Sequence, residues 1–589
     1  MRPTAVLLAL GACLLAACTA PPPVRYEDLV AREIPGGAVP PGEQIECGDR
    51  TLFSRPLDPG EGAALDIELG EEPRLVLEAC RMGSPGVLTV TVDTGGVVDR
   101  RLVLDLGEEA WVRREEDLAG LAGRRVTVRL AAEGPAGPEP VAVSEAVVRH
   151  RPPAPALAAS GAGGRARRAP KILLVSFDTL RADLGDGSSP TPAFDRLAAD
   201  AEVYDRHYAT GSWTKPSHAS MLTGQRAPLH GVRGGGDPLE PAVPLLAELL
   251  RAAGLATGGL VHDCAWLDPK WGFGRGFDSY RSLKWTSSQL ARGAVNWMAE
   301  HRDEPFFYFL HLFNVHSDFH HLPYEAPGVT QASVEERFDE AGYGCREGAC
   351  SSALLARIRE GTIAPLPREG EILSHLYTAG VAEADGVLAG LRADLEDLGL
   401  WDDLLVVVTS DHGELLLEHG ETLHGQHWDE VLRVPFYVKW PDGERAGWRV
   451  EVPTTALDLA PTVLAAAGLA SDALPGADLH RPPPRRRPLL AEYGRTWQTV
   501  HLGPLKAVLV RGGEDLLFDL AADPREARSL AARRPEDLER LRALAAAADR
   551  RDARLLRKLR AGSDGAAPDA HLTEEEKERL RSLGYLRGP

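Results

Sequence analysis

The stretch KILLVSFD, residues 171–178, decides the fold of the larger part of this 589-residue chain. Its first seven residues are almost all apolar, which is typical of a strand buried on both faces of a sheet. Apolar runs at 306–310 and 404–409 predict two further buried strands, and helical patterns lie at 243–253 and 377–398. Strands that alternate with helices predict an α/β domain with a mostly parallel sheet.

The sequence on either side of this domain has a different pattern of polar and apolar residues. The runs 65–69, 87–92 and 126–130 alternate polar and apolar residues and are separated by Gly and Pro, which predicts an antiparallel β-sandwich. Short strands and a charged helix from Pro535 predict a small α+β subdomain at the other end. We therefore expect a signal peptide (1–18), a tether (19–45), a β-sandwich domain (46–151), a linker (152–170), the α/β domain (171–468) and a C-terminal subdomain with a helical tail (469–589).

The N-terminal residues predict export. The apolar run at 5–17 follows Arg2 and is too short to span a bilayer as a helix. It ends in Leu-Ala-Ala-Cys at 15–18, which resembles a bacterial lipobox and implies cleavage before Cys18 and lipidation of its thiol. The alternative is an ordinary signal peptide that carries a cysteine. We expect an exported bacterial lipoprotein on the periplasmic or cell-surface side of the outer membrane, which only its lipid holds to the membrane.

Net charge and cysteine content restrict the possible partners, disulfides and metal sites. The formal charge of −20 argues against nucleic acid as a partner, because a phosphate backbone needs a basic face. Cys345 and Cys350 lie close together in a Gly-rich segment, and in an oxidising compartment we expect them to form a disulfide. Cys47 and Cys80 are a further candidate pair, and Cys264 is expected to be a buried thiol. The chain has no C-x-x-C pair, so cysteine-bound zinc is not expected.

Polar residues that follow the predicted strands are candidates for chemistry, because open α/β sheets place their active sites there. Asp178 follows the first buried strand and is an oxygen ligand candidate, although such an Asp often only caps the next helix. Thr214 falls at the start of a predicted helix, where backbone N–H groups favour an anion; the alternative is a helix N-cap. Asp411 and His412 offer one oxygen and one nitrogen ligand, a set suited to zinc or manganese.

The order of these segments resembles the sulfatase family of the alkaline phosphatase superfamily. That family carries an acidic motif after its first strand, a C-x-P-S-R motif on a helix that ends in L-T-G, a late S-D-x-G motif and an R-V-P segment. Here Asp178, WTKPSHASMLTG (213–224), SDHG (410–413) and RVP (433–435) occur in that order. Minor matches are TPAFDRL (191–197) and LFDLAADP (517–524). The resemblance runs from about Lys171 to the C-terminus and implies a mostly parallel sheet sandwiched by helices and a metal-dependent hydrolase of sulfate or phosphate esters.

The chain departs from the sulfatase pattern at the positions that carry the chemistry. Sulfatases oxidise a Cys or Ser to formylglycine, and Thr214 stands in that place. Its extra methyl group prevents aldehyde formation, so we predict no formylglycine. Thr179 replaces the usual second Asp, His218 the Arg of P-S-R, His412 the Asn after the late Asp, and His424 the later lysine.

The ligand set that remains is complete. The resemblance implies that Asp178, Thr214, Asp411 and His412 hold one divalent metal ion, which is zinc, manganese or calcium, and it leaves a second ion open. The same constellation is similar to the phosphodiesterase and phosphotransferase members of the superfamily, which use threonine directly. A divalent metal lowers the pKa of a hydroxyl group, so Thr214 is the predicted nucleophile.

Histidines near the predicted strand ends are candidates for proton transfer. His316 matches the family's D-x-H position, with Asn314 in place of the Asp, and His424 matches the family's lysine. We assign His316 and His424 to catalysis. The neighbouring histidines can equally be structural: His311, His320 and His321.

Lys215 and His218 follow Thr214 in the same motif, and we assign them to substrate binding. The expected substrate is a sulfated or phosphorylated small molecule or glycan. A formylglycine hydrate has a second hydroxyl group from which the sulfated intermediate can collapse, and a threonine ester lacks it. A phosphodiester or phosphonate ester is therefore chemically favoured. Two alternatives stay open, a phosphoryl-group transferase acting on envelope lipids or glycans and a non-catalytic surface protein; the sequence does not fix the oligomeric state.

Overall fold

The computed structural model describes only part of the chain. The described residues are 25–28, 43–47, 50–57, 62–69, 71–81, 86–95, 97–106, 112–133, 141–151, 170–185, 190–316, 355, 358, 360–362, 364, 369–471 and 473–561. The predictions for Cys18, Cys345, Cys350, His320 and His321 lie outside these residues and stay predictions. Cys264 is a buried free thiol. Among the described helices, none is both long and apolar enough to cross a membrane.

Two antiparallel sheets form a sandwich near the N-terminus. One sheet has the order β2 (Glu43–Cys47), β3 (Arg50–Leu57), β10 (Val141–Arg151), β5 (Glu71–Arg81) and β8 (Val112–Asp117), with β1 (Arg25–Asp28) paired to β10; the other has the order β4 (Gly62–Glu68), β9 (Arg125–Glu133), β6 (Gly86–Thr94) and β7 (Val97–Leu106). Their inward side chains, such as Leu75, Leu77, Val90 and Val128, form one apolar core. The three alternating runs of the sequence fall in β4, β6 and β9.

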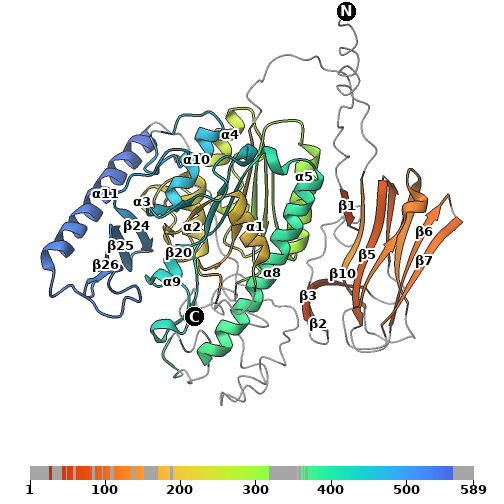
Figure 1. The fold of residues 1–589 in the computed structure, drawn as a ribbon, viewed down its shortest axis with the longest axis horizontal. Coiled ribbons are helices and arrows are strands. Elements are labelled where there is room, and N and C mark those ends of the chain that lie inside the picture. Colours follow the sequence, from red (N-terminus) through yellow and green to blue (C-terminus); the bar gives the residue numbers. More distant parts are fainter. Residues whose placement is uncertain are drawn as a thin grey trace, which may run out of the picture.

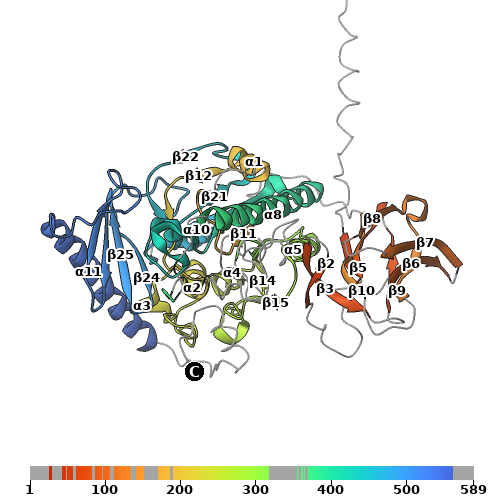
Figure 2. The same ribbon diagram turned by 90° about the horizontal axis from the view of Figure 1, so that it is seen from below.

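An eight-stranded sheet forms the centre of the larger body (Figures 1 and 2). Its order is β15 (Ser279–Leu283), β14 (Ala256–His262), β16 (Phe306–Leu312), β11 (Lys171–Phe177), β17 (Leu404–Ser410), β21 (Phe436–Lys439), β12 (Glu202–Tyr204) and β22 (Arg449–Val450). The pairs from β15 to β17 are parallel, and β21 is antiparallel to both of its neighbours. The sheet is therefore mostly parallel, as predicted.

Helices cover both faces of this sheet. Leu173 and Val175 of β11 face one side and pack with α1 (Pro192–Asp200), α5 (Ser287–Glu300) and α8 (Glu369–Asp397). Ile172 and Leu174 face the other side and pack with α2 (Thr214–Thr223), α4 (Leu246–Ala252) and α10 (Leu459–Ala466). The central strands β16 and β17 are buried along their whole length between the two helix layers, which explains why their sequences are mostly apolar. The arrangement confirms the α/β class.

Two helix boundaries differ from the sequence prediction. Helix α8 begins at Glu369, two turns before the predicted residue 377, because its apolar stripe already includes Leu373 and Leu376. Helix α4 begins at Leu246 and not at 243, since Pro244 disfavours the helical conformation for the residue before it.

A four-stranded antiparallel sheet follows the central body, in the order β24 (Leu489–Tyr493), β25 (Trp497–Leu502), β26 (Leu505–Val510) and β27 (Leu516–Asp519). Helix α11 (Pro535–Ala561) covers one face, as Figure 1 shows in blue. The other face contributes Trp497 and Phe518 to a cluster with Tyr208 and Leu432 of the α/β body. The short elements at this junction are β13 (His207–Tyr208), β20 (Arg433–Val434), β23 (Thr454–Thr455), α3 (Ala227–His230) and α9 (Asp429–Leu432).

Candidate active site

Parallel register brings the polar residues to one edge of the sheet. Ser176 of β11 lies opposite His311 of β16 on one side and opposite Thr409 of β17 on the other. Because the three strands run in the same direction and in step, they end together. Asp178 follows β11 there, and Asp411 and His412 follow β17.

Asp178, Asp411 and His412 form a cluster that fits a metal ion. One ligand atom from each residue lies within 4.8 Å of the others, and all three side chains are buried. His412 Nε2 lies 3.6 Å from Asp178 Oδ1 and 3.3 Å from Asp411 Oδ2. None of these three atoms has a hydrogen-bond partner within the described residues. Buried polar atoms are rarely left without a partner, so the cluster fits a divalent cation.

The backbone fixes which atoms face this centre. His412 Nδ1 donates to the carbonyl oxygen of Gly413 at 2.9 Å, which leaves Nε2 as the free lone pair. Asp411 Oδ1 accepts from the backbone N–H groups of Thr179 and His412 at 3.2 and 2.9 Å, which leaves Oδ2. Gly413 cannot carry a side chain, because a Cβ atom there would lie 2.1 Å from the Glu430 carbonyl oxygen.

Burial makes the two carboxylates unstable as anions without a cation. Loss of solvation raises the pKa of Asp178, and the electrostatic interactions of its carboxylate with His316 and His412 oppose the rise. Burial also raises the pKa of Asp411, and the negative charge of Asp178 adds to it. A divalent ion between the two carboxylates would offset both effects.

Thr214 lies at the first position of α2, and its hydroxyl group faces the cluster. Its Oγ1 donates to Asp178 Oδ2 at 3.3 Å, and the residue is fully buried. The N-cap of α2 is Trp213, so the alternative role of Thr214 as an N-cap is wrong. The first-turn N–H groups of this ten-residue helix begin at Thr214, at the end of the dipole that favours an anion.

Thr179 holds a backbone conformation that β-branched residues rarely adopt, with φ = 58°. Its N–H donates to Asp411, its hydroxyl group to the Val315 carbonyl oxygen at 2.7 Å, and its carbonyl oxygen accepts from the Tyr377 hydroxyl group at 2.8 Å. These bonds fix the turn after Asp178. Thr179 therefore joins three parts of the chain at the site.

His311 is a site residue that sequence reasoning did not assign. Its Nε2 lies 3.1 Å from Asp178 Oδ2, the oxygen that also accepts from Thr214. Burial lowers the pKa of His311 to about 4, so the ring is neutral and donates to the carboxylate. The signal that could have identified His311 is its place in the sequence: it is the penultimate residue of β16, a strand that pairs in register with β11.

His316 and His424 lie close to the cluster and to each other. The ring centroid of His424 is 4.3 Å from that of His412 and 5.4 Å from that of His316. Phe313 stacks on His316 at 4.2 Å, and Glu414 Oε2 lies 3.7 Å from His424 Nδ1. Both histidines are buried, so the structure brings the two predicted catalytic rings to the same edge as the ligands.

The contacts of His218 and Lys215 do not support their assignment to substrate binding, which stays a prediction. His218 Nδ1 donates to the Thr214 carbonyl oxygen at 2.9 Å, and Nε2 lies 3.0 Å from Ser176 Oγ. The ring therefore attaches the first turn of α2 to β11. Lys215 Nζ lies 3.3 Å from the ring centroid of Trp271 and donates to the Gly235 carbonyl oxygen at 2.7 Å.

Comparison with known proteins places this site in a family. The family model described as Sulfatase matches residues 170–469. Rat steryl-sulfatase is 26% identical over 53% of this chain and 69% of its own length, and the multifunctional alkaline phosphatase superfamily protein PehA of Trinickia caryophylli is 25% identical over 50% and 73%. Zebrafish arylsulfatase K is 29% identical, but the chain spans only 35% of its length.

Solved structures share the fold. The phosphonate monoester hydrolase of Agrobacterium radiobacter superposes with a TM-score of 0.51 at 22% identity, over 67% of this chain and 96% of the other. A putative sulfatase from Bacteroides thetaiotaomicron superposes with a TM-score of 0.52 at 19% identity, over 70% and 100%. The central sheet and its helix layers are thus of the alkaline-phosphatase-like type.

Proposed function

The chain belongs to the sulfatase family, and from this premise we propose that it is a metal-dependent hydrolase of sulfate or phosphate esters with Thr214 as its nucleophile. The relatives are named for both chemistries, steryl-sulfatase for sulfate esters and phosphonate monoester hydrolase for phosphorus esters. One observation carries the proposal. The Thr214 hydroxyl group lies 3.3 Å from Asp178, a member of the cluster that fits a metal ion.

In this proposal Asp178, Asp411, His412 and Thr214 would hold the ion. When bound, a divalent ion would lower the pKa of the threonine hydroxyl group and stabilise charge on the ester oxygens. The N-terminus of α2 presents N–H groups to the same anionic centre. His311 donates to Asp178 and keeps that carboxylate oriented.

The chemical steps use the threonine and the two nearby histidines. The Thr214 hydroxyl group first gives its proton to solvent, its Oγ1 then forms a bond to phosphorus or sulfur as the alkoxide, and the bond to the leaving-group oxygen breaks. His316 or His424 gives that oxygen its proton. The histidine that has lost its proton then takes one from water, the resulting hydroxide attacks the threonine ester, and the Thr214 oxygen leaves. The products are an alcohol and the acid anion.

Among the two substrate classes we propose phosphorus esters, such as a phosphodiester or a phosphonate monoester. A formylglycine hydrate can expel sulfate from its second hydroxyl group, and threonine has no such group. Release must then come from water attack on the ester itself. Phosphorus accepts such a second attack more readily than sulfate sulfur, so the replacement of the family's Cys or Ser by Thr favours phosphorus.

A covalent intermediate tests this proposal. The metal-loaded protein is mixed with p-nitrophenyl esters of sulfate, phosphate, methyl phosphate and phenylphosphonate, quenched in acid and digested. We expect the mass of a phosphoryl or phosphonyl group on the peptide that contains Thr214, and faster release of nitrophenol from phosphorus esters. Turnover with no modified Thr214 peptide at any quench time would contradict the nucleophile, and faster sulfate release would contradict the substrate class.

A further inference from the structure

A short hairpin between β17 and α9 carries two residues of the candidate active site. Its strands β18 (Leu415–Leu416) and β19 (Thr422–Leu423) pair antiparallel, with the first residue of β18 opposite the last residue of β19. One step further along the same ladder, the residue before β18 is opposite the residue after β19. These two residues are Glu414 and His424. The register of the hairpin therefore brings a carboxylate to a histidine that the proposed function uses.

The side chains of Glu414 and His424 face each other in the interior of the protein. Glu414 Oε2 lies 3.7 Å from His424 Nδ1, and the two side chains are 0% and 4% exposed. This is the distance of an ion pair, and the hydrogen bonds of catalytic residues are often long until the substrate is bound. A carboxylate on the Nδ1 side favours the ring form that carries a proton on Nδ1, so Nε2 is the nitrogen that remains for chemistry.

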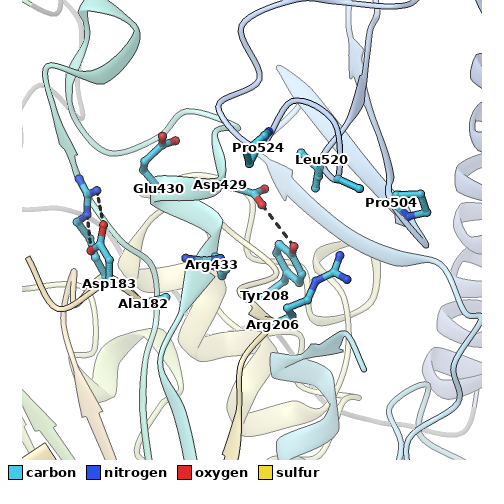
Figure 3. A pocket seen from close by; sticks show the side chains of 12 residues that line it. Ala182, Asp183, Arg206, Tyr208, Asp429, Glu430, Arg433, Pro504, Leu520 and Pro524 are labelled. Carbon is cyan, nitrogen blue, oxygen red and sulfur yellow. Dashed lines mark hydrogen bonds and ion pairs between the residues drawn. The ribbon is translucent and has the colours of Figure 1, made fainter. Parts of the chain in front are cut away.

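Contacts on both sides hold the backbone of Glu414 in place. The Gly413 N–H group donates to the Val431 carbonyl oxygen at 2.7 Å, and the Glu414 carbonyl oxygen accepts from Arg181 Nη1 at 3.0 Å. The same guanidinium group forms an ion pair with Asp183 at 2.7 Å (Figure 3). The Glu414 side chain therefore projects from a fixed position and needs no loop movement to reach the histidine.

The ring of His424 lies on the metal side of this pair. Its centroid is 4.3 Å from that of His412 and 5.4 Å from that of His316. The buried Leu423 before it holds φ = 64°, which leucine rarely adopts, and Gly425 after it holds φ = 108°. The backbone of His424 is therefore held in a tight turn, and the orientation of its ring depends on its side-chain partners.

We propose that Glu414 is the positioning residue of His424 and that it makes His424 the group that protonates the leaving-group oxygen. The inference rests on the proposed function, in which His316 or His424 gives that proton. Phe313 stacks on His316 at 4.2 Å, and such a partner fixes the plane of a ring but not its tautomer. Glu414 fixes the tautomer of His424, since its carboxylate faces Nδ1.

The proton step is confined to Nε2 of His424. Nε2 gives its proton to the leaving-group oxygen as the bond from that oxygen to phosphorus breaks, and the alcohol departs. In the second half of the reaction, Nε2 takes a proton from the water whose hydroxide attacks the threonine ester. Glu414 itself takes no part in the transfer.

Leaving groups of different acidity test the assignment in the full, metal-loaded chain. Phenol is a far weaker acid than p-nitrophenol, so phenoxide needs a proton as it leaves and nitrophenoxide does not. We expect Glu414→Gln to lower kcat/KM for the phenyl ester of phenylphosphonate by about 10–100-fold, and for the p-nitrophenyl ester by no more than about threefold. The ratio of the two losses is the readout. Because both esters are measured on one sample, unfolded protein cancels from it.

Combined variants show through which ring Glu414 acts. In the His424→Gln background, Glu414→Gln should change the ratio no further, because the side chain that it positions is gone. In the His316→Gln background it should change the ratio as it does in wild type. The matched control is Glu421→Gln, the same substitution in the same hairpin, at a side chain that accepts from Trp428 Nε1 at 3.3 Å. Its ratio should equal that of wild type.

Equal losses on both esters in Glu414→Gln would overturn the proposal, and so would a full effect of Glu414→Gln without His424. Both results leave Thr214 as the nucleophile, because the acid-quenched peptide reports that role separately. Absence of the modified Thr214 peptide overturns the proposed function and this inference with it. Should Glu414→Gln not fold, Glu414→Asp withdraws the carboxylate by one methylene group and decides by the same ratio.

Discussion

At the scale of single residues, hydrogen bonds to the backbone determine which atoms of Asp411 and His412 face the metal cluster. Asp411 uses one oxygen for two N–H groups, and His412 uses one nitrogen for a carbonyl oxygen. Each side chain therefore presents a single atom to the centre. With this preorganisation, a small set of ligands would hold a metal ion with little ordering cost at binding.

Replacing one ligand tests the metal assignment. In Asp411→Asn and in His412→Ala we expect bound divalent metal to fall from about one equivalent to near zero, because a ligand atom is lost from a small set. Elemental analysis of the purified proteins measures it. The control Asp402→Asn changes an exposed carboxylate outside the cluster and should keep its metal. Unchanged metal content in both ligand variants would refute the assignment.

A substitution at Gly413 tests how closely the SDHG segment (410–413) is packed. Gly413→Ala places a Cβ atom 2.1 Å from a backbone oxygen, so the segment that carries His412 must move. We expect a loss of about 2–4 kcal/mol in the free energy of unfolding and weaker metal binding. The matched control is Gly390→Ala on the exposed side of α8, where nothing lies within 4 Å; it should stabilise by about 0.5–1 kcal/mol. Similar values for both variants in urea titrations would show that the packing is not close.

Sequence reasoning at this scale found the residues that follow strands and missed one that lies inside a strand. Asp178, Asp411 and His412 were predictable together, because parallel strands end at one edge. His311 lies within an apolar run, where a histidine is as easily structural, and only the strand register reveals its contact with Asp178. The side-chain contacts of Lys215 depend on Trp271, which lies 56 residues later in the sequence.

At the scale of elements, α11 is joined to the chain segment that follows α2. Arg226 lies two residues after the end cap of α2 and forms a buried ion pair with Asp552 at 2.7 Å and a second ion pair with the half-exposed Asp549 at 2.9 Å. The bridge from Gly211 to Glu492 attaches the other end of α2 to β24. The C-terminal subdomain therefore supports both ends of the helix that presents Thr214.

The Arg226 pair tests this support. Arg226→Ala removes one of the two arginine partners of the buried Asp552 and leaves only the half-exposed Arg551, and we expect a cost of about 1.5–3 kcal/mol in the free energy of unfolding. Urea denaturation measures it. The control Arg560→Ala removes an exposed arginine at the end of α11, which pairs with Glu240 of the α/β body, and its effect should lie within error. Equal effects of the two variants would remove α11 from the support of α2.

At the scale of the whole molecule, the sequence predicted the sheet class and its helix layers because the strands are continuously apolar. It did not predict how the C-terminal subdomain packs. That packing depends on aromatic contacts such as Tyr208 with Phe518 and Trp497, which come from segments about 300 residues apart. The boundaries of α4 and α8 were less accurate, since tertiary packing and a proline set them.

The proposed reaction depends on one hydroxyl group, that of Thr214. Thr214 begins the helix that α11 and β24 support, and its hydroxyl group faces the metal cluster. If this group is the nucleophile, a variant without it keeps the fold and loses the reaction. If it is only structural, the reaction survives its removal.

The most direct test is therefore kcat/KM for Thr214→Ala and Thr214→Ser on the best phosphorus ester, with metal content and melting temperature measured for each. We expect the alanine variant to lose at least about 10⁴-fold in kcat/KM while it folds and keeps most of its metal. The serine variant supplies the same oxygen with a freer rotamer and should keep activity within about 10²-fold of wild type. An alanine variant that turns over within a few-fold of wild type would contradict the account.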